Sequence, residues 1–344
     1  KPCQPQGRTQ QGGGLMSAAR IAVVAFGGNA VYPPNIRGLA EEQLEVMAGV
    51  CRQLVQLIKA GWQLVITHGN GPVVGNILFR MARTASELPP MPMDVCVAHS
   101  QGGMGYMLQQ SLGNVMREAG LPASVCAMVT QVEVDAADPA FQHPTKPVGR
   151  FFSADEAQQM AQQTGWTFAE DSGRGWRRVV PSPAPLRILE IDAVRALMHA
   201  GILPVVSGGG GIPVVRAADG SYHGAPAVID KDLTSAMLAT ELGAQKLLLL
   251  TGVDQVALDF GRPTQRLLDR LTVSEAREHY LAGQFPPGSM GPKVQAAMQF
   301  LQSAQCGAAA GSGGSSAGRE VVITSLDRAV EAMDGKAGTR MVAS

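Results

Sequence analysis

The stretch Gln63–Gly75, QLVITHGNGPVVG, is a short apolar run that breaks into Gly69-Asn70-Gly71-Pro72. An apolar run of this length, ended by a glycine turn, is typical of a strand buried in a parallel sheet. Proline is favoured in the first turn of a helix. The stretch therefore predicts a strand, a tight turn and a helix, which is the repeating unit of an α/β fold.

The same pattern recurs along the chain. Strand-like runs lie at 21–26, 63–67, 124–134 and 320–325, and a strand followed by a loop is expected at both 201–211 and 246–254. Apolar residues at helical spacing fill 39–60 and 93–119. Alternating strands and helices predict an α/β fold, a mainly parallel sheet with helices on both faces. Ligands bind such sheets beyond the carboxyl ends of the strands. One edge should therefore gather the glycine turns Gly27-Gly28, Gly69–Gly71, Gly208–Gly211 and Gly252.

Composition narrows the class of protein. The chain has 344 residues, of which 45% are hydrophobic and 16% charged, so it can bury the core of one large α/β domain. The formal net charge is zero and the pI is about 7.2. No basic stripe alternates with aromatic residues, which argues against nucleic acid or an acidic membrane as a partner. No apolar run approaches the roughly 18 residues that would span a bilayer.

Three segments interrupt the alternation of strands and helices. Residues 1–20 are rich in Gln and Gly and are expected to be a disordered leader or an appended segment. Residues 135–190, which hold Pro139, Pro144 and Pro147 and the cluster Arg174, Arg177 and Arg178, predict a small excursion or lid. Residues 307–318, GAAAGSGGSSAG, predict a flexible loop. Five cysteines without a C-x-x-C pair favour a reduced, cytoplasmic chain, although an organellar leader stays open.

The glycine turn after residue 68 does not match the common nucleotide motifs. In the dinucleotide fingerprint G-x-G-x-x-G/A the third position is Val74, and Gly75 comes one residue late. Asp94, the acid at the right distance, follows no strand, and no segment reads G-K-[ST]. A purely structural turn is the alternative for this one loop. Four such turns on one edge instead favour an anionic ligand, because glycine exposes backbone N–H groups.

Three lysines could complement such a ligand. Lys231 in VIDKDLTSAMLA and Lys293 in GSMGPKVQAAM lie at helix starts, and Lys146 lies between two prolines in HPTKPVGRF. Each could be a solvated surface lysine. A cation at a helix start is unfavourable for stability, because that end already carries partial positive charge, so the position favours a bound anion. Asp232 is either an ordinary N-terminal acid of the helix or the residue that holds two lysines in register.

Several blocks resemble one family and occur in its order. They are VVAFGGNAV, THGNGPVVG, DPAFQHPTKPVGRF, RGWRRVVPSP, SGGGGIPVV, VIDKDL, LTGVD and GSMGPKV. The chain resembles the carbamate kinases of the amino-acid-kinase superfamily from about Ile21 to Val342. Phe26 and Arg150 depart from the usual pattern, in which Leu and Pro stand at those positions.

The resemblance implies a three-layer αβα sandwich with an open, mainly parallel eight-stranded sheet and a small protruding subdomain, working as a homodimer. Within 21–344, an N-terminal lobe (about 21–215, including the subdomain at about 135–190) would take carbamate or carbamoyl phosphate. A C-terminal lobe (about 216–344) would take ADP or ATP with Mg²⁺, held through the nucleotide phosphates and not by a protein metal site. The implied reaction converts carbamoyl phosphate and ADP to ATP and carbamate, as an ATP-yielding step of arginine breakdown.

The resemblance also implies roles for single residues. Lys146, Lys231, Asp232 and Lys293 would be catalytic. The phosphoryl group and the carbamoyl end would be bound by Gly27, Gly28, Asn29, Gly69, Asn70 and Gly71. The nucleotide would be bordered by Gly208, Gly209, Gly210, Gly211, Thr251, Gly252, Val253, Asp254, Met290 and Gly291.

Two rival functions remain at this point. Kinases of amino-acid carboxylates such as acetylglutamate usually carry a Lys just before the first Gly-Gly, where this chain has Phe26. A non-catalytic nucleotide-binding protein of the same fold is the other rival, and it would bind ADP without turnover.

Overall fold

The computed structural model describes residues 20–33, 36–171, 173–309 and 318–344. The predicted disordered segment 1–20 lies outside the described residues, apart from Arg20. Of the predicted loop 307–318, residues 307–309 belong to a helix, and 310–317 lie outside the described residues. In the described part of the chain, no helix is both long enough and apolar enough to cross a membrane.

The main sheet has eight strands and is mainly parallel, as the sequence predicts. In spatial order they are β15 (Arg270–Thr272), β17 (Thr339–Val342), β16 (Glu320–Ser325), β12 (Lys246–Thr251), β1 (Arg20–Phe26), β2 (Trp62–His68), β9 (Leu203–Val205) and β3 (Val125–Ala127). The pair β16–β17 is antiparallel. The central strand β1 pairs with β2 and β12 in parallel, so these three strands end on the same edge of the sheet.

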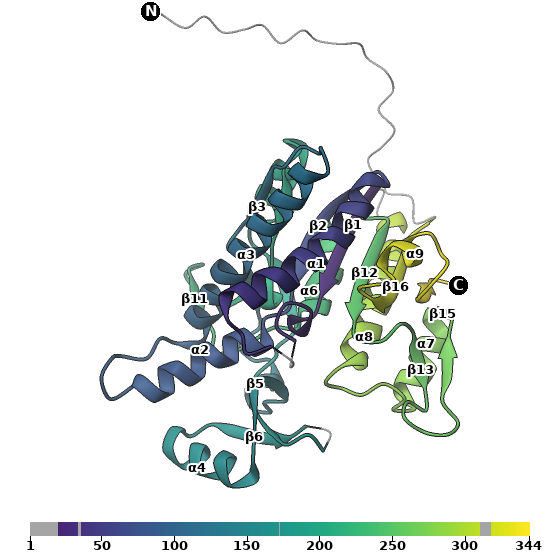
Figure 1. Cartoon of the computed structure of the whole chain (residues 1–344). Coiled ribbons are helices and arrows are strands. Elements are labelled where there is room, and N and C mark those ends of the chain that lie inside the picture. Colours follow the sequence, from purple (N-terminus) through teal and green to yellow (C-terminus); the bar gives the residue numbers. More distant parts are fainter. Residues whose placement is uncertain (1–19, 34–35, 172, 310–317) are drawn as a thin grey trace, which may run out of the picture.

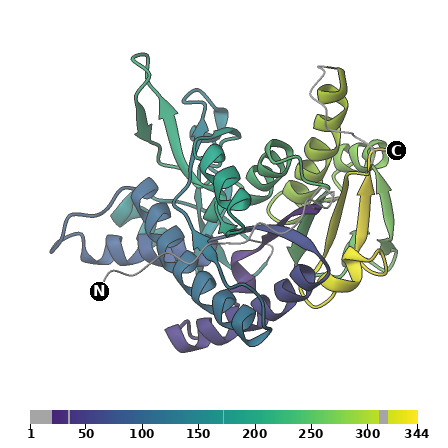
Figure 2. The ribbon, with the colours of Figure 1, turned by 90° about the horizontal axis from the view of Figure 1, so that it is seen from above.

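Side-chain alternation along β1 shows why two helical layers are needed. Val23 and Ala25 belong to one buried core, whereas Ala22, Val24 and Phe26 belong to the other. Successive strand residues point to opposite faces, so an apolar run must be covered on both sides. The first face is covered by α5 (Ile191–His199), α6 (Lys231–Glu241), α7 (Val273–Leu281) and α8 (Met290–Ala309). The second is covered by α1 (Ala40–Lys59), α3 (Met93–Glu118) and α9 (Ala329–Met333). The layers are visible in Figures 1 and 2, where the green-to-yellow C-terminal part lies to one side.

A second sheet of four strands lies beside the main one. It runs β11 (Tyr222–Gly224), β10 (Ile212–Arg216), β4 (Gln131–Val134) and β8 (Pro185–Ile188). The single strand expected over 124–134 is therefore wrong, because β3 lies in the main sheet and β4 in the second. The chain changes sheets at Thr130, whose N–H bonds to the Gln101 side chain and whose C=O accepts from Ile212. Apolar periodicity cannot report such a change of partner.

The protruding subdomain is a three-stranded sheet with one helix, set apart from the body in Figure 1. Its strands are β5 (Lys146–Phe152), β7 (Trp176–Val180) and β6 (Thr167–Glu170), and its helix is α4 (Ala154–Thr164). Helix α2 (Gly71–Thr84) packs against β5. Arg150, which stands where the family usually has a proline, pairs with Glu156 at 3.0 Å and lies over the Phe152 ring. Both partners belong to the subdomain. The remaining elements are the hairpin β13 (Val256–Leu258) and β14 (Arg266–Leu268), with short 3-10 helices η1 (Gly28–Ala30), η2 (Pro139–Phe141) and η3 (Gly208–Gly210).

Candidate active site

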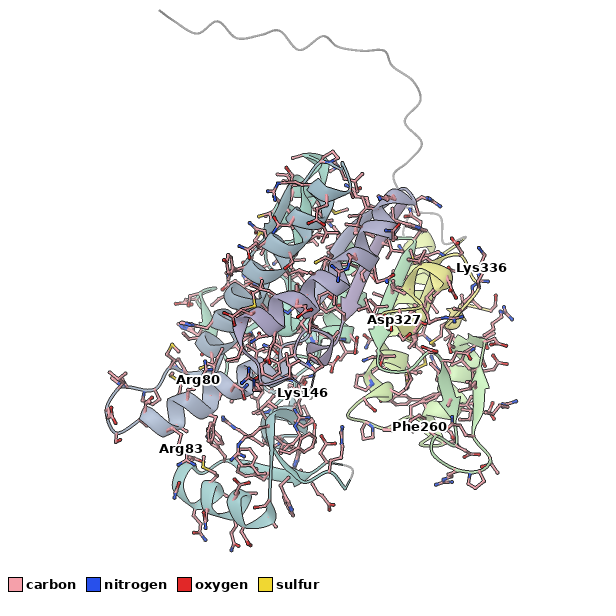
Figure 3. The ribbon with its side chains drawn as sticks, in the orientation of Figure 1. Arg80, Arg83, Lys146, Phe260, Asp327 and Lys336 are labelled. Carbon is pink, nitrogen blue, oxygen red and sulfur yellow. The ribbon has the colours of Figure 1, made fainter. Side chains whose placement is uncertain are left out.

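A cleft of about 540 Å³ opens beyond the carboxyl ends of the central strands. It is lined from β1 by Gly27 and Gly28, from β2 by Gly69 and Asn70 and the start of α2, and from β12 by Thr251 and Gly252. The helix starts of α6 and α8 supply Lys231, Asp232 and Lys293, and the subdomain supplies Lys146 and Arg177. Figure 3 shows Lys146 where the subdomain meets the body, with Asp327 on the C-terminal part. The prediction that glycine turns gather on one edge is thus confirmed for three of the four turns and for Gly209 of the fourth.

The first two glycine turns touch each other through their backbones. The Gly69 N–H donates to the Phe26 carbonyl at 2.8 Å. A Cβ atom on Gly69 would lie 2.7 Å from the Gly28 nitrogen and 3.3 Å from Cδ of Lys231. No side chain fits at Gly69, because two backbone segments and the aliphatic part of a lysine side chain lie in close contact there.

The centre of the cleft holds two lysines on one carboxylate. Lys231 Nζ lies 2.5 Å from Asp232 Oδ1, and Lys293 Nζ lies 2.9 Å from Asp232 Oδ2. Lys231 and Lys293 are each 8% exposed and Asp232 is 3% exposed. Of the two possibilities open for Asp232, the geometry supports the residue that holds two lysines in register. One carboxylate for two ammonium groups leaves a net positive charge facing the cleft.

The protonation states follow from this arrangement. Burial alone would raise the pKa of Asp232, but the charges and hydrogen bonds of Lys231 and Lys293 outweigh it, so the pKa lies well below its usual range. Burial lowers the pKa of Lys231 against the opposing effect of Asp232. For Lys293, burial is outweighed by Asp232 and the pKa is raised. Asp232 is therefore an ionised counter-ion and a poor proton acceptor.

Lys146 reaches the body of the protein through a second aspartate. Its Nζ donates to Asp230 Oδ2 at 2.7 Å. Asp230 is also the N-cap of α6, because its Oδ1 accepts the Asp232 N–H at 2.9 Å. The lysine of the subdomain and the helix that carries Lys231 thus share one carboxylate.

Buried polar contacts hold Asn70 and the neighbouring Gly208–Gly211 loop in place at the wall of the cleft. The Asn70 side chain donates from Nδ2 to Ser100 Oγ at 2.8 Å, and Asn70 is only 2% exposed. Gln101 binds the Gly208 carbonyl at 2.9 Å and so fixes the Gly208–Gly211 loop against this wall. A Cβ atom on Gly209 would lie 2.1 Å from Asn70 Nδ2.

Comparisons with known proteins show the family of this chain. A model of the amino acid kinase family matches residues 20–308. A carbamate kinase of Pyrococcus horikoshii is 43% identical over 93% of this chain and 98% of its own length. One from Staphylococcus haemolyticus is 45% identical over 92% of this chain and 97% of its own length. The carbamate kinase of Giardia lamblia bound to citric acid superimposes with a TM-score of 0.86 at 40% identity, covering 95% of this chain and 99% of that one.

This chain is a member of the carbamate kinase family. It is therefore a kinase of the amino acid kinase family, and the predicted αβα fold is confirmed. The structure of the Giardia lamblia carbamate kinase bound to AMP-PNP, with a TM-score of 0.81, shows that a relative with 40% identity binds an ATP analogue.

Not every residue assigned by the family resemblance lines the cleft of this carbamate kinase. The Gly208–Gly211 loop follows β9, which β1 and β2 separate from β12 and its Thr251 loop, so it lies beside Asn70 and away from the expected nucleotide side. Asp254 lines a neighbouring depression with Arg328 and Lys336. Met290 packs against the core. Val253 and Gly291 do not line the cleft, and the side chain of Asn29 lies outside what the structure describes.

Three charged residues of the cleft were not predicted as site residues from the sequence. Asp230 could have been found from its place two residues before Asp232, which is where an N-cap carboxylate is expected. Arg177 lies in the noted arginine cluster, but only the pairing of β5 with β7 brings it to the cleft that Lys146 also lines. Asp327 follows β16, and no motif marks it.

Proposed function

We propose that this carbamate kinase transfers the phosphoryl group of carbamoyl phosphate to ADP, reversibly, through the residues of the described cleft. The bond from phosphorus to the carbamoyl oxygen breaks, a bond to a β-phosphate oxygen of ADP forms, and carbamate leaves as an anion. No base is needed because the attacking β-phosphate oxygen of ADP is already deprotonated, and no acid is needed because the leaving group, carbamate, departs as an anion. The observation that carries the proposal is the pair of buried lysines on Asp232.

The barrier to this reaction is electrostatic. Two unit negative charges at about 4 Å repel by roughly 4 kcal/mol at an effective dielectric near 20. Phosphoryl transfer is catalysed mainly by positioning and by positive charge placed on the transferring oxygens. A nearly buried net positive charge, held rigidly at two helix starts, meets that need without reorganisation.

Each charged residue then has a role. Lys231 and Lys293 brace the transferring phosphoryl group, and Asp232 orients both ammonium groups. Lys146 approaches from the subdomain on the carbamoyl phosphate side. The turn Gly27-Gly28-Asn29 holds the phosphoryl group through its backbone, and Gly69, Asn70 and Gly71 face the carbamoyl end.

The nucleotide is proposed to lie on the β12 side of the cleft. Thr251 and Gly252 line it there, together with Ser289 at the start of α8. The remaining nucleotide contacts predicted from the family, at Gly208–Gly211, Val253, Asp254, Met290 and Gly291, stay predictions.

Mg²⁺ fits this cleft as a partner of the nucleotide phosphates. All four oxygens of Asp230 and Asp232 already accept from Lys146, Lys231, Lys293 or a backbone N–H, so both carboxylates serve as partners of these groups. Asp327 is the cleft carboxylate without an ion pair among the described residues. Mg²⁺ commonly binds through phosphates and one or two carboxylates and neutralises charge on the transferring group.

We also propose that the enzyme works as a homodimer in the cytoplasm and generates ATP in arginine breakdown. The family resemblance supports the first and last of these, and five cysteines without paired spacing support a reducing compartment.

The test is ATP formation from carbamoyl phosphate and ADP in a coupled assay, with and without Mg²⁺. Lys231→Ala and Lys293→Ala should each lower kcat at least about 100-fold, because each removes charge from the transition state. Lys59→Ala, at an exposed position of α1, is the matched control and should leave kcat unchanged. A correctly folded Lys231 or Lys293 variant within about threefold of wild type would exclude that lysine from the mechanism.

A further inference from the structure

Asn70 occupies a helix N-cap but does not cap the helix. It precedes α2, and its side chain makes no hydrogen bond to the first turn. Asparagine at this position ordinarily uses its side-chain oxygen to accept an N–H of that turn. Here the amide is turned toward Ser100 of α3 instead.

Ser100 fixes which way the Asn70 amide faces. The Ser100 hydroxyl donates its single proton to the Val97 carbonyl at 2.6 Å. Its oxygen can therefore only accept from Asn70, and the Asn70 atom 2.8 Å away must be the NH₂ group. The opposite orientation would set two acceptor oxygens against each other.

The consequence is a free acceptor on the wall of the cleft. Oδ1 of Asn70 has no hydrogen-bond partner among the described residues, and it is not one of their fully enclosed side-chain atoms that lack a partner. Asn70 and Gly209, the residue against which its amide packs, both line the cleft, so this unpaired oxygen belongs to the cleft wall. The adjacent Gly71 N–H, at the start of α2, is likewise unpaired within the described chain. An acceptor and a donor therefore lie side by side.

We propose that Asn70 Oδ1 accepts a hydrogen bond from the N–H of the carbamoyl group. Ser100 is the positioning residue that orients the Asn70 amide for this contact. The inference rests on the proposed function and adds the basis of its substrate selectivity. A carbamoyl group offers an NH₂ donor to Oδ1 and a carbonyl acceptor to the Gly71 N–H. An acetyl group has a methyl in place of the NH₂, and it leaves the nearly buried oxygen unpaired.

This arrangement selects carbamoyl phosphate over acetyl phosphate. A site built to hydrogen-bond a substrate N–H discriminates strongly against an analogue that lacks it, because its own polar group then stays unsatisfied. Ser100 contributes without touching the substrate. Once the Ser100 hydroxyl is removed, the Asn70 amide can turn over and present NH₂, which repels the carbamoyl NH₂. Acetyl phosphate is unaffected, because its methyl group leaves the facing amide atom unpaired in either orientation.

The experiment measures kcat/KM for ATP formation from ADP with carbamoyl phosphate and, separately, with acetyl phosphate. We define the selectivity ratio as kcat/KM for carbamoyl phosphate divided by kcat/KM for acetyl phosphate. We expect Ser100→Ala to lower this ratio by about tenfold, the effect of one lost hydrogen bond. Asn70→Ala should lower the ratio further, and adding Ser100→Ala to Asn70→Ala should change it no more. The control is Ser111→Ala, another buried serine of α3, which should keep the wild-type ratio.

The outcomes separate the inference from the proposed function. If Ser100→Ala lowers both values equally, or changes the ratio as much when Asn70 is already Ala, Ser100 does not act through Asn70 and the inference is overturned. If the wild-type protein makes no ATP from carbamoyl phosphate at all, the proposed function itself fails. A ratio that falls only while Asn70 is present supports both.

Discussion

At the scale of single residues, burial at the end of β2 sets the charge of His68. The ring is 2% exposed, and burial lowers its pKa to about 4, partly opposed by its contact with the Gly69 carbonyl and reinforced by the charge of Lys231. A Cβ atom on Gly208 would lie 2.5 Å from Nε2 of this ring. His68 is therefore neutral near pH 7 and supports the Gly208 loop as an uncharged side chain.

A pH dependence of stability follows from His68. Its folded pKa lies below the unfolded value near 6.5, so the unfolded chain takes up a proton first as the pH falls. The free energy of unfolding should therefore decrease between pH 6.5 and pH 4, by up to about 3 kcal/mol. Carboxylates with lowered pKa, such as Asp232, contribute stability above their unfolded pKa near 3.9 that is lost below it, so measurements above pH 4.5 avoid most of their effect.

Urea unfolding at pH 7.5 and pH 4.7 measures this dependence. His68→Gln should reduce the difference between the two pH values by about half or more, since it removes the largest titrating contribution in that window. His99→Gln, at an exposed position of α3, is the control and should keep the wild-type difference. An unchanged difference in His68→Gln would mean that the imidazole is not held neutral.

Residue types were predictable from sequence, but their partners were not. Lys146, Lys231 and Lys293 could be named because a cation at a helix start or between prolines needs an explanation. That Lys231 and Lys293 share Asp232, whereas Lys146 pairs with Asp230, depends on which helices meet, and no local pattern contains that information.

At the scale of elements, one residue at the N-terminus of α6 both caps the helix and binds a lysine of the site. Asp230 caps the helix with one oxygen and binds Lys146 with the other. Asn is as good an N-cap as Asp, whereas Ala loses the cap at a cost of about 1 kcal/mol. Asp230→Asn should therefore be about 1 kcal/mol more stable than Asp230→Ala in urea unfolding.

Both Asp230 variants should also lower kcat/KM for carbamoyl phosphate, by about tenfold, because Lys146 loses the counter-ion that holds it. The two variants thus separate capping from ion pairing: stability should differ between them, and activity should not. Equal stabilities would show that the Asp232 N–H does not depend on the cap. A selective loss of activity in Asp230→Ala would assign the effect to the helix rather than to Lys146.

Strands and helices were the best-predicted elements, because each buried strand is a continuous apolar run and each helix repeats every three to four residues. The predictions of secondary structure were wrong where contacts between distant segments decide the structure. Residues 124–134 divide between two sheets at Thr130, and α8 includes 307–309, which the sequence assigned to a loop.

At the scale of the whole molecule, one glycine contact sets how closely the subdomain approaches the body. Gly75 of α2 lies against Gly149 of β5, and a Cβ atom on Gly75 would be 2.0 Å from the Gly149 Cα. Lys146 begins the same strand. The packing of these two glycines therefore determines where Lys146 can reach.

Gly75→Ala should push β5 away from α2 and lower kcat/KM for carbamoyl phosphate by about tenfold or more, because small displacements of a positioning group are costly in phosphoryl transfer. Steady-state kinetics in the coupled assay measure this. Gly102→Ala is the matched control, since Gly102 also lies within a helix but has open space around its Cβ position. That control should retain wild-type activity, and activity retained in Gly75→Ala would show that the subdomain need not sit this close.

The sequence by itself determined the α/β class, the mainly parallel sheet, the glycine turns on one edge and the lysines of the site. These features follow from local periodicity, turn chemistry and helix-end electrostatics, which are written in neighbouring residues. Only the tertiary structure decided the order of the strands, the division between two sheets, the placement of the Gly208–Gly211 loop beside Asn70 and the pairing of each lysine. Those depend on contacts between segments far apart in the chain, such as Lys146 with Asp230, whose geometry exists only once the layers have packed.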